Sequence, residues 1–401
     1  MRIGILGYGT VGSGLVDLID NNKGKREIEI CSILIRDIEK YKGKKHFEKI
    51  TTNIDDIFEQ DIDILVELIG GLNPSLDYIK RALNNKIHVV TANKDLLAEY
   101  GDELINIAND NEVSIKFEAS VAGGIPVLKP LIESLEGNNV DSINAILNGT
   151  TNFILSKMYD ENLSYNEALK QAQDLGFAEA NPDADVLGYD AARKLSILST
   201  LAYDNRVYWK DVYLEGITDI DEKDIEYAKK LNCKIKLIGQ SKYRNEKVSA
   251  FVRPVLVGNE SILSKVDNEF NAVILNGDSV GELSFIGKGA GKLATGSAVY
   301  SDIIDILDNR LSCVDSFTRD IIKVNQVIDS KCSALLRFTD YKKDEILSII
   351  NECINKYDIL NESDELAILV DADSEYEINN SICVIKDKGY CDQINKLLKI
   401  G

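Results

Sequence analysis

The sequence predicts an α/β fold in which a parallel sheet is followed by an α+β part and by a small C-terminal unit. Short apolar strands alternate with helices from residue 1 to about 135, and this alternation is typical of a parallel sheet with helices on both faces. Beyond about 140 the strands look antiparallel, and a new strand–helix order starts at 331. We therefore predict parts at 1–135, 136–325 and 331–401, with 287–320 packing back on the first.

Apolar patterning predicts each element of the first part. Short runs of apolar residues bounded by turn residues indicate buried strands, and longer segments with helical periodicity indicate helices. The predicted strands are 2–6, 28–35, 62–68, 87–91 and 113–117, and the predicted helices are 11–19, 74–84 and 96–109.

The pattern changes in the rest of the chain. Strands at 141–147, 248–257 and 271–283 and helices at 165–176, 190–203 and 295–307 predict an α+β part with its helices on one side of the sheet. The predicted order of the last unit is βαββα, which a further strand could complete. Its predicted elements are the strands 333–338, 366–370 and 381–385 and the helices 344–356 and 393–399.

The composition argues against several classes of protein. A formal net charge of −20 disfavours nucleic acid or an anionic membrane as the main partner, because phosphate groups bind to basic surfaces. The seven cysteines are scattered without a CxxC pair, which favours reduced thiols, and the two histidines, His46 and His88, indicate no metal cluster. Neither a signal peptide nor an apolar run of membrane-spanning length is seen, so we expect a cytoplasmic location.

A glycine-rich turn joins the first strand to the first helix. Gly7, Gly9 and Gly12 fit the pattern GxGxxG, in which glycines form the tight turn, admit a pyrophosphate and let the helix pack on the strand. The helix start at Thr10 and Val11 offers free amides and a positive dipole end to phosphate. This context predicts a Rossmann-type, dinucleotide-binding domain, with a plain strand–helix turn as the alternative.

Basic residues follow the second strand, where NAD-binding proteins usually carry an acidic residue for the ribose. Arg36 comes first, and lysines follow between 40 and 45. A guanidinium group suits a 2′-phosphate, so we predict NADP as the cofactor. Asp37 leaves NAD possible, and the lysines can equally belong to a solvated loop.

The segment 176–194 carries the clearest signal of a catalytic site. Asp190 and Lys194 lie four residues apart at the start of a predicted helix, and therefore on one face of it, while Glu179 and Asp185 lie in the preceding loop. Carboxylates can hold a substrate ammonium group, and a protonated lysine can polarise a carbonyl and protonate the alkoxide that hydride addition leaves. The pattern predicts hydride transfer at an amino-acid side chain, with a surface ion pair between Asp190 and Lys194 as the alternative.

A second lysine, Lys94, follows a predicted parallel strand. The carboxyl ends of such strands line the ligand crevice, so Lys94 could reach the nicotinamide or the reacting oxygen. An exposed lysine at the start of a helix is the alternative.

Taken together, these segments closely resemble homoserine dehydrogenase. The matching stretches run in the order of the family over residues 1 to about 310, and 176–194 is the most specific of them. The other stretches are 7–12 (GYGTVG), 91–94 (TANK), 118–126 (EASVAGGIP), 148–153 (NGTTNF) and 287–291 (GKGAG).

The resemblance implies roles for the matching residues. Lys194 matches the catalytic acid–base group and Lys94 the second active-site lysine. Glu179 and Asp190 match substrate-binding positions, and Asp185 lies in the same loop. The positions that match cofactor contacts are Gly9, Thr10 and Val11 in the pyrophosphate loop, and Gly176 and Gly291 elsewhere.

The resemblance also implies a sodium ion. Glu118 and the backbone carbonyls of Val121, Gly123 and Ile125 match the sodium site of the family. One carboxylate with neutral carbonyls suits a monovalent ion that prefers oxygen ligands.

The last unit, 331–401, resembles an ACT domain, which binds a regulatory amino acid in relatives. Such domains usually carry a Pro-Gly turn after their first strand, and 339–344 contains neither residue. Either binding of threonine or a role in subunit association alone is compatible with this sequence.

The resemblance implies a cytoplasmic enzyme, a homodimer or homotetramer, whose second part serves substrate binding, catalysis and dimerisation. It would reduce L-aspartate 4-semialdehyde to L-homoserine with NADPH on the route to threonine and methionine. Two alternatives stay open: a related dehydrogenase of another amino-acid semialdehyde or α-carbonyl acid, and a non-catalytic sensor of nucleotides and amino acids. The presence of both Lys94 and Lys194 disfavours the sensor, which needs no acid–base lysine.

Overall fold

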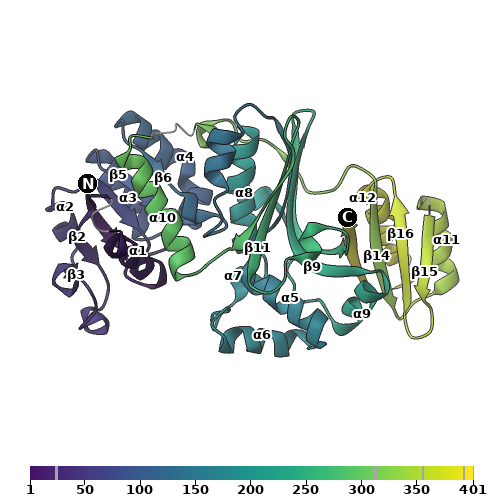
Figure 1. The fold of residues 1–401 in the computed structure, drawn as a ribbon. Helices are drawn as coiled ribbons and strands as arrows, with labels where there is room; N and C mark the ends of the chain where they lie inside the picture. The colour runs from purple at the N-terminus through teal and green to yellow at the C-terminus, as the bar shows by residue number, and fades with distance from the viewer. Residues whose placement is uncertain (23–25, 311–314, 355, 392, 401) are drawn as a thin grey trace. The chain divides into compact units, whose positions relative to one another are not determined.

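The computed structural model describes residues 1–22, 26–310, 315–354, 356–391 and 393–400, and the chain divides into two compact units (Figure 1). The first unit comprises Met1–Gly149, Asp190–Asp211 and Glu269–Lys323. The second comprises Thr150–Tyr189, Val212–Asn268 and Val324–Gly401. Both units are therefore assembled from separate stretches of the sequence.

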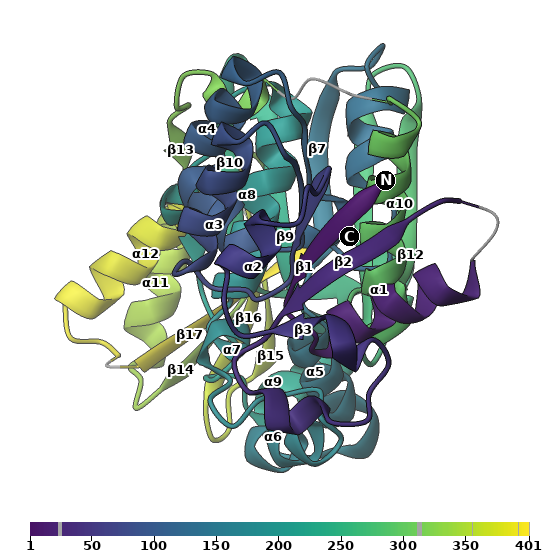
Figure 2. The same ribbon diagram turned by 90° about the vertical axis from the view of Figure 1, so that its left-hand side faces the viewer.

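The first unit contains the predicted parallel sheet. Among the described residues its strand order is β3-β2-β1-β4-β5-β6, and each neighbouring pair is parallel, as β1, β2 and β3 show in Figure 2. The winding direction changes between β1 and β4, and in such sheets ligands bind beyond the carboxyl ends of the strands at that point. The strands are β1 (Arg2–Leu6), β2 (Glu29–Leu34), β3 (Ile50–Thr51), β4 (Ile64–Glu67), β5 (His88–Thr91) and β6 (Ile115–Lys116).

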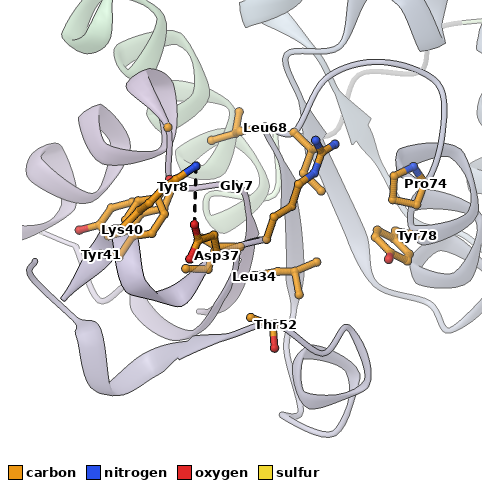
Figure 3. Close-up of a pocket in the computed structure, with 14 residues that line it drawn as sticks. Gly7, Tyr8, Leu34, Asp37, Lys40, Tyr41, Thr52, Leu68, Pro74 and Tyr78 are labelled. Atoms are coloured by element: carbon orange, nitrogen blue, oxygen red, sulfur yellow. Dashed lines mark ion pairs between the residues drawn. The ribbon is translucent and has the colours of Figure 1, made fainter.

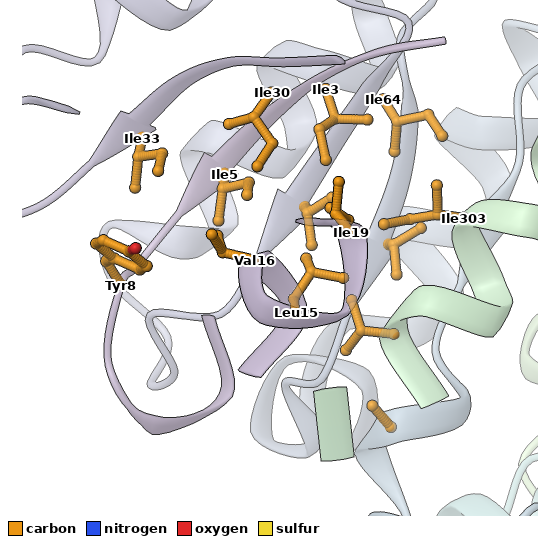
Figure 4. Close-up of a cluster of buried hydrophobic side chains, with 14 of the residues drawn as sticks. Ile3, Ile5, Tyr8, Leu15, Val16, Ile19, Ile30, Ile33, Ile64 and Ile303 are labelled. Atoms are coloured by element: carbon orange, nitrogen blue, oxygen red, sulfur yellow. The ribbon is translucent and has the colours of Figure 1, made fainter. Parts of the chain in front are cut away.

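Two helices that are distant in sequence cover one face of this sheet. Helix α1 (Thr10–Asn21) and helix α10 (Lys292–Leu307) share an apolar cluster with β1, β2 and β4, in which Leu15 of α1 and Ile303 of α10 are fully buried (Figure 4). A Cβ atom at Gly14 would lie 2.0 Å from the backbone oxygen of Lys292. Glycine at this position therefore permits the close approach of the two helices. The remaining long helices of the first 149 residues are α3 (Ser75–Asn84) and α4 (Lys94–Asp110).

The rest of the first unit is an antiparallel meander and a long helix. Strand β11 (Phe270–Gly277) pairs with β7 (Val140–Ile146) on one side and with β12 (Gly281–Lys288) on the other. Helix α8 (Tyr189–Tyr203) carries the residues Asp190 and Lys194, as its sequence predicts. The predicted parallel sheet and antiparallel pairing are thus confirmed. The single strand predicted at 271–283 is wrong, because the chain turns at 278–280 and forms the hairpin of β11 and β12.

The second unit is built on the hairpin of β9 (Cys233–Arg244) and β10 (Lys247–Gly258). Strand β9 was not predicted, although its apolar residues Cys233, Ile235 and Leu237 alternate with two lysines as in a strand. One of them, Lys236, is only 1% exposed, and its ammonium donates to Asn152 Oδ1 (2.9 Å), Val266 O (2.7 Å) and Asp267 Oδ1 (2.9 Å). The helices of this unit before residue 324 include α5 (Gly149–Glu161), α6 (Tyr165–Asp174), α7 (Asp183–Val186) and α9 (Glu222–Lys230).

The C-terminal segment of the second unit has the order βαββαβ. The predicted strand at 381–385 is wrong, because this stretch lies in a helix whose buried residues Ile378, Ser381 and Ile385 follow helical spacing. The predicted helix at 393–399 is also wrong, because these residues form a strand that pairs with both β10 and β14. The elements are β14 (Cys332–Thr339), α11 (Lys343–Cys353), β15 (Lys356–Asn361), β16 (Leu366–Ala372), α12 (Glu375–Asp387) and β17 (Gln393–Ile400).

Two further findings concern the described residues alone. None of their helices combines the length and apolar character needed to cross a membrane. Their cysteines are free thiols, while Cys313 lies outside the described residues.

Candidate active site

The glycine turn has the geometry of a phosphate-binding loop. Gly7 has a φ of 103°, and a Cβ atom at Gly12 would lie 2.2 Å from the Gly7 carbonyl oxygen, so both positions require glycine. A Cβ atom at Gly9 would meet nothing within 4 Å. Gly9 is also the N-cap of α1 and provides no side-chain cap, so the amides at Thr10 and Val11 stand at an open helix start.

A pocket of about 520 Å³ opens beside this turn. The aromatic rings of Tyr8 and Tyr41 stack with centroids 5.5 Å apart on one side of the pocket, and Pro74 and Tyr78 lie on the other side (Figure 3). The remaining lining residues come from the glycine turn, the end of β2 and the segment that follows it, the end of β3 and the loop after β4, namely Gly7, Gly9, Leu34, Ile35, Arg36, Asp37, Lys40, Thr52, Leu68 and Ile69.

Arg36 and Asp37, which were predicted to select the cofactor, differ in the hydrogen bonds and ion pairs that their side chains form. Asp37 Oδ1 accepts the N–H of Glu39 at 3.1 Å, and Asp37 Oδ2 lies 3.6 Å from Lys40 Nζ (Figure 3). Arg36 lines the pocket, and within the described ranges its guanidinium forms no hydrogen bond or ion pair. The carboxylate is thus used to shape the turn, while the cation is available to a ligand.

The buried Glu67 organises the carboxyl ends of β4 and β5. Its Oε2 accepts the hydroxyl of Thr91 at 2.7 Å, and its Oε1 accepts the N–H of Gly70 at 3.0 Å. Asn93 then donates to the Gly71 carbonyl at 2.7 Å and caps α4, whose first residue is Lys94. Sequence analysis did not identify Glu67 as a positioning residue. Its place at the end of a predicted strand is the one signal that could have suggested this role.

A lysine–aspartate–lysine cluster lies in the first unit. Asp190 Oδ1 is 3.1 Å from Lys94 Nζ, and Asp190 Oδ2 is 2.7 Å from Lys194 Nζ. Asn148 Nδ2 also donates to Asp190 Oδ2 at 2.9 Å, and Lys194 Nζ donates to the Leu147 carbonyl at 2.9 Å. The side chains of Asp190 and Lys194 are only 7% and 13% exposed, so their interaction is not an ordinary surface ion pair.

Electrostatics keep this carboxylate ionised. Burial acts to raise the pKa of Asp190, but the charges of Lys194 and Lys94, with hydrogen bonds from Lys194 and Asn148, hold it well below its usual range. The ammonium of Lys194 carries three hydrogens, of which the Asp190 carboxylate and the Leu147 carbonyl accept two. One N–H of Lys194 therefore remains for a further acceptor.

Contacts between α4 and α8 hold the two lysines near one carboxylate. Arg206, which is buried, follows α8 and donates to the Ala98 carbonyl of α4 at 2.8 Å. Arg193 of α8 lies 3.3 Å from Asp95 of α4, and its guanidinium stacks over the ring of Trp209. These positioning residues were not found from the sequence, because their partners are distant in the chain.

Glu118 is enclosed by backbone amides. Its carboxylate accepts N–H groups from Val127 (2.7 Å), Leu128 (3.0 Å) and Lys129 (2.8 Å), and its own N–H donates to Asp302 Oδ2 at 2.9 Å. Burial raises the pKa of Glu118, and the three amides oppose this shift. The carboxylate is therefore fixed in position inside the first unit.

The loop after Glu118 contains three backbone carbonyl groups that accept no hydrogen bond from the described residues. In the described part of the chain, no hydrogen bond ends on the carbonyl oxygen of Val121, Gly123 or Ile125. A Cβ atom at Gly123 would lie 2.2 Å from the Gly289 oxygen, and Gly124 N–H donates to the Lys288 carbonyl at 3.1 Å. The segment 287–291 therefore packs directly against this loop.

The remaining candidate residues lie at the edges of other elements. Gly291 is the N-cap of α10 with a φ of 135°, in the first unit. Glu179 and Gly176 are exposed and Asp185 is half-buried, and all three belong to the second unit. The structure thus brings Lys94, Asp190 and Lys194 together, while the roles of the other four residues stay predictions.

Replacing Asp190 by Asn should destabilise the fold, because two ammonium groups would lose their shared counter-charge. We expect the free energy of unfolding to fall by roughly 3 kcal/mol at pH 7. A carboxyl whose pKa is lowered on folding contributes stability above its unfolded pKa and loses it as the pH falls through its folded pKa. The difference between wild type and variant should therefore be constant from about pH 5 to 8 and shrink below about pH 4.

Urea unfolding at several pH values measures this difference. Asp183→Asn, at an exposed position, is the matched control and should leave the stability within about 0.5 kcal/mol of wild type. A similarly small effect of Asp190→Asn would contradict the assigned role of the carboxylate.

Comparisons with known proteins identify the family of this chain. A family model described as "Homoserine dehydrogenase, NAD binding domain" matches residues 7–118, and one described as "Homoserine dehydrogenase" matches residues 126–304. The chain is 44% identical over 317 residues to a homoserine dehydrogenase of Bacillus subtilis (strain 168), a match that covers 77% of this chain and 73% of that protein.

Solved structures are similar over the same region and beyond it. A homoserine dehydrogenase from Thiobacillus denitrificans has a TM-score of 0.92 at 32% identity, covering 100% of this chain and 98% of that chain. A hyperthermophilic archaeal homoserine dehydrogenase in complex with NADPH has a TM-score of 0.66 at 28% identity, covering 78% of this chain and 99% of that chain. The chain therefore belongs to the homoserine dehydrogenase family, whose members are NAD(P)-dependent oxidoreductases that act on a CH–OH group.

Proposed function

We propose that this chain reduces L-aspartate 4-semialdehyde to L-homoserine with NADPH, and that Lys194 supplies the proton. The main support is that the buried carboxylate of Asp190 contacts two lysines, with its oxygens 3.1 Å from Lys94 Nζ and 2.7 Å from Lys194 Nζ. Membership of the family makes the chain an oxidoreductase rather than a non-catalytic sensor. The bound nicotinamide would supply the hydride, and the protein supplies position and charge.

Lys194 is proposed as the general acid. Its third N–H would donate to the aldehyde oxygen, polarise the carbonyl and then protonate the alkoxide, which completes the alcohol. Asp190 keeps this ammonium in place and also holds Lys94, which we propose as the second active-site lysine, near the nicotinamide. In the oxidation direction the same lysine would accept the proton.

Glu179 is proposed as the main anchor of the substrate ammonium group. Its carboxylate forms no hydrogen bond or ion pair within the described residues, whereas both oxygens of Asp190 are engaged by lysines. We therefore propose that Asp190 contributes to substrate binding chiefly through the lysines that it holds. Asp185 is proposed to support the same loop.

Lys194→Ala should retain cofactor binding and lose turnover. We expect kcat for aspartate semialdehyde reduction to fall by about 10²–10⁴-fold, the usual contribution of a general acid. The loss of nicotinamide absorbance measures turnover, and quenching of protein fluorescence measures binding of the dinucleotide. Lys170→Ala, at an exposed lysine of α6, is the control and should behave as wild type.

The same assay with a panel of semialdehydes tests the substrate. A clear preference of the wild type for another amino-acid semialdehyde would favour the related dehydrogenase. Near-normal kcat in Lys194→Ala would remove this residue from the mechanism.

NADP is proposed as the preferred cofactor because the side chain of Arg36 is available to a ligand, whereas that of Asp37 is already hydrogen-bonded within its own turn. The free guanidinium faces a pocket that is bordered by the glycine turn, while the carboxylate already caps the turn at Glu39. Gly7, Gly9 and Gly12, with Thr10 and Val11, are proposed to receive the pyrophosphate, and Gly176 and Gly291 to complete the cofactor site.

Arg36→Ala should raise KM for NADPH at least tenfold and change KM for NADH little, because only NADPH has a 2′-phosphate to lose a charge-assisted hydrogen bond. Steady-state kinetics with each cofactor measure both values. Lys42→Ala is the control, since Lys42 is paired with Glu39 in the same segment. An equal effect of Arg36→Ala on both cofactors would contradict the proposed preference.

A sodium ion is proposed at Glu118, because the residues present fit it. The carbonyl oxygens of Val121, Gly123 and Ile125 have no hydrogen-bond donor in the described part of the chain, and the carboxylate of Glu118 is already held by three amides. The ion would hold this loop against 287–291, and we assign it no chemical step.

Sodium should raise the melting temperature of the wild type relative to choline chloride at equal ionic strength, because an ion that binds only the folded state stabilises it. Glu118→Gln should abolish this difference, because the neutral amide lacks the charge and one acceptor oxygen. Scanning calorimetry gives the measurement without reference to activity. Glu133→Gln is the control, and a sodium effect that persists in Glu118→Gln would place the ion elsewhere.

The proposed function also implies a domain organisation. We propose a dinucleotide-binding domain over 1–135, a substrate-binding and dimerisation domain over 136–325, and an ACT-like domain over 331–401, for which the order βαββαβ is the support. A cytoplasmic homodimer or homotetramer on the route to threonine and methionine is the corresponding biological setting.

A further inference from the structure

A basic pocket lies at the tip of the β9–β10 hairpin in the second unit. It has a volume of about 600 Å³ and is bordered on one side by the two strands and on the other by the segment 325–331. Its basic lining residues are Lys242, Arg244, Lys247 and Lys331. Such a concentration of positive charge is unexpected in a chain with a formal net charge of −20.

The charges of this pocket lack strong partners. Arg244 and Lys247 lie directly opposite each other in the hairpin, and like charges at such positions destabilise an antiparallel pair. Among the described residues, Lys242, Arg244 and Lys247 form no ion pair, and Lys331 comes only within 3.9 Å of Asp373. A bound anion would relieve this repulsion.

Lys242 is the most buried of these basic side chains. Its side chain is half-buried, whereas Arg244 and Lys247 are exposed. Burial lowers the pKa of Lys242, and the nearby charge of Arg244 lowers it further. Burying a cation without a counter-charge costs free energy, and an anion in the pocket would recover part of it.

The rest of the lining includes neutral polar residues and one acidic residue, Asp329, so the four cations exceed the acidic groups by three. Ser249 and Ser330 are among the neutral lining residues. The amide oxygen of Asn325 accepts from Tyr376 O–H (3.2 Å) and Val327 N–H (3.3 Å), which leaves the amide nitrogen to donate to a ligand. The pocket therefore combines cations and hydrogen-bond donors in a volume typical of small-molecule sites.

We propose that this pocket binds a small polyanion, a molecule with two or more phosphate or carboxylate groups, through Lys242, Arg244 and Lys247. The site is separate from the glycine turn and is independent of the proposed reaction. Ile328, which also lines the pocket, donates its N–H to Glu375 Oε2 at 3.0 Å, and Glu375 forms a buried bidentate pair with Arg253 of β10. Binding would therefore act on a segment that is fixed to the core of the second unit.

Calorimetric titration with inorganic pyrophosphate tests the site, with citrate as a polycarboxylate. The protein is first saturated with NADPH, because free pyrophosphate would otherwise compete for the glycine turn. The wild type should bind one pyrophosphate per chain, more weakly at higher salt. The double variant K242Q/R244Q should lose at least tenfold in affinity, because it removes two cations that can form charge-assisted hydrogen bonds to the anion.

The control is K386Q/K388Q, which removes the same charge from exposed positions at the end of α12 and should bind as wild type. If K242Q/R244Q fails to fold by circular dichroism, Lys247→Gln, at an exposed position, should still lower the affinity. Equal affinity in the pocket variants and the control, or no binding of either anion to wild type at millimolar concentration, would overturn the proposal. A second result would also overturn it: no anion binding to wild type, together with a molar mass of K242Q/R244Q in light scattering that differs from that of wild type. That result would mean that the pocket binds an acidic surface of another copy of the chain.

Discussion

The contact between Asp190 and the two lysines is the interaction on which the candidate active site depends. A single carboxylate that is 7% exposed holds Lys94 and Lys194, which would otherwise repel each other in a partly buried setting. The arrangement requires that α4 and α8 be held in register, because the lysines come from different helices. It also fixes the direction of the remaining N–H of Lys194, since the other two hydrogens are already used.

The support for this cluster comes from residues with no expected part in the chemistry. Glu67 ties the ends of β4 and β5 together and so sets where α4 begins. Arg206 then fastens the end of α8 to two successive carbonyls of α4. Polar side chains that bond to backbone groups in this way are well suited to position a site, because they fix the direction of an element as well as its distance.

Much of the first unit could be predicted from sequence, because its signals are local. The glycine turn, the strand–helix alternation and the spacing of Asp190 and Lys194 each concern residues that are close in the chain. Lys94 could be placed from its position after β5 alone. By contrast, the roles of Asn148 and Arg206 depend on partners about 40 and 110 residues away, which no local pattern reveals.

Errors were concentrated where tertiary contacts override local preference. Residues 393–399 have a helix-like composition, yet they form a strand because β10 and β14 offer backbone partners on both sides. The apolar, β-branched run at 381–385 looks like a strand, but its buried positions fit one face of α12. Strand β9 is a different case, because Cys233, Ile235 and Leu237 alternate with lysines and so do indicate a strand. What no local pattern reveals there is that Lys236 occupies a core position with its own hydrogen-bond partners.

The pairing of β17 with β10 bears on how the chain acquires its fold during synthesis. Val255 of β10 pairs with Leu398 of β17, so this edge of β10 stays open until the ribosome has released residues far beyond the hairpin. Until then β10 presents unpaired amides and carbonyls to neighbouring nascent chains. A chaperone that shields this strand edge would therefore aid the yield of native protein.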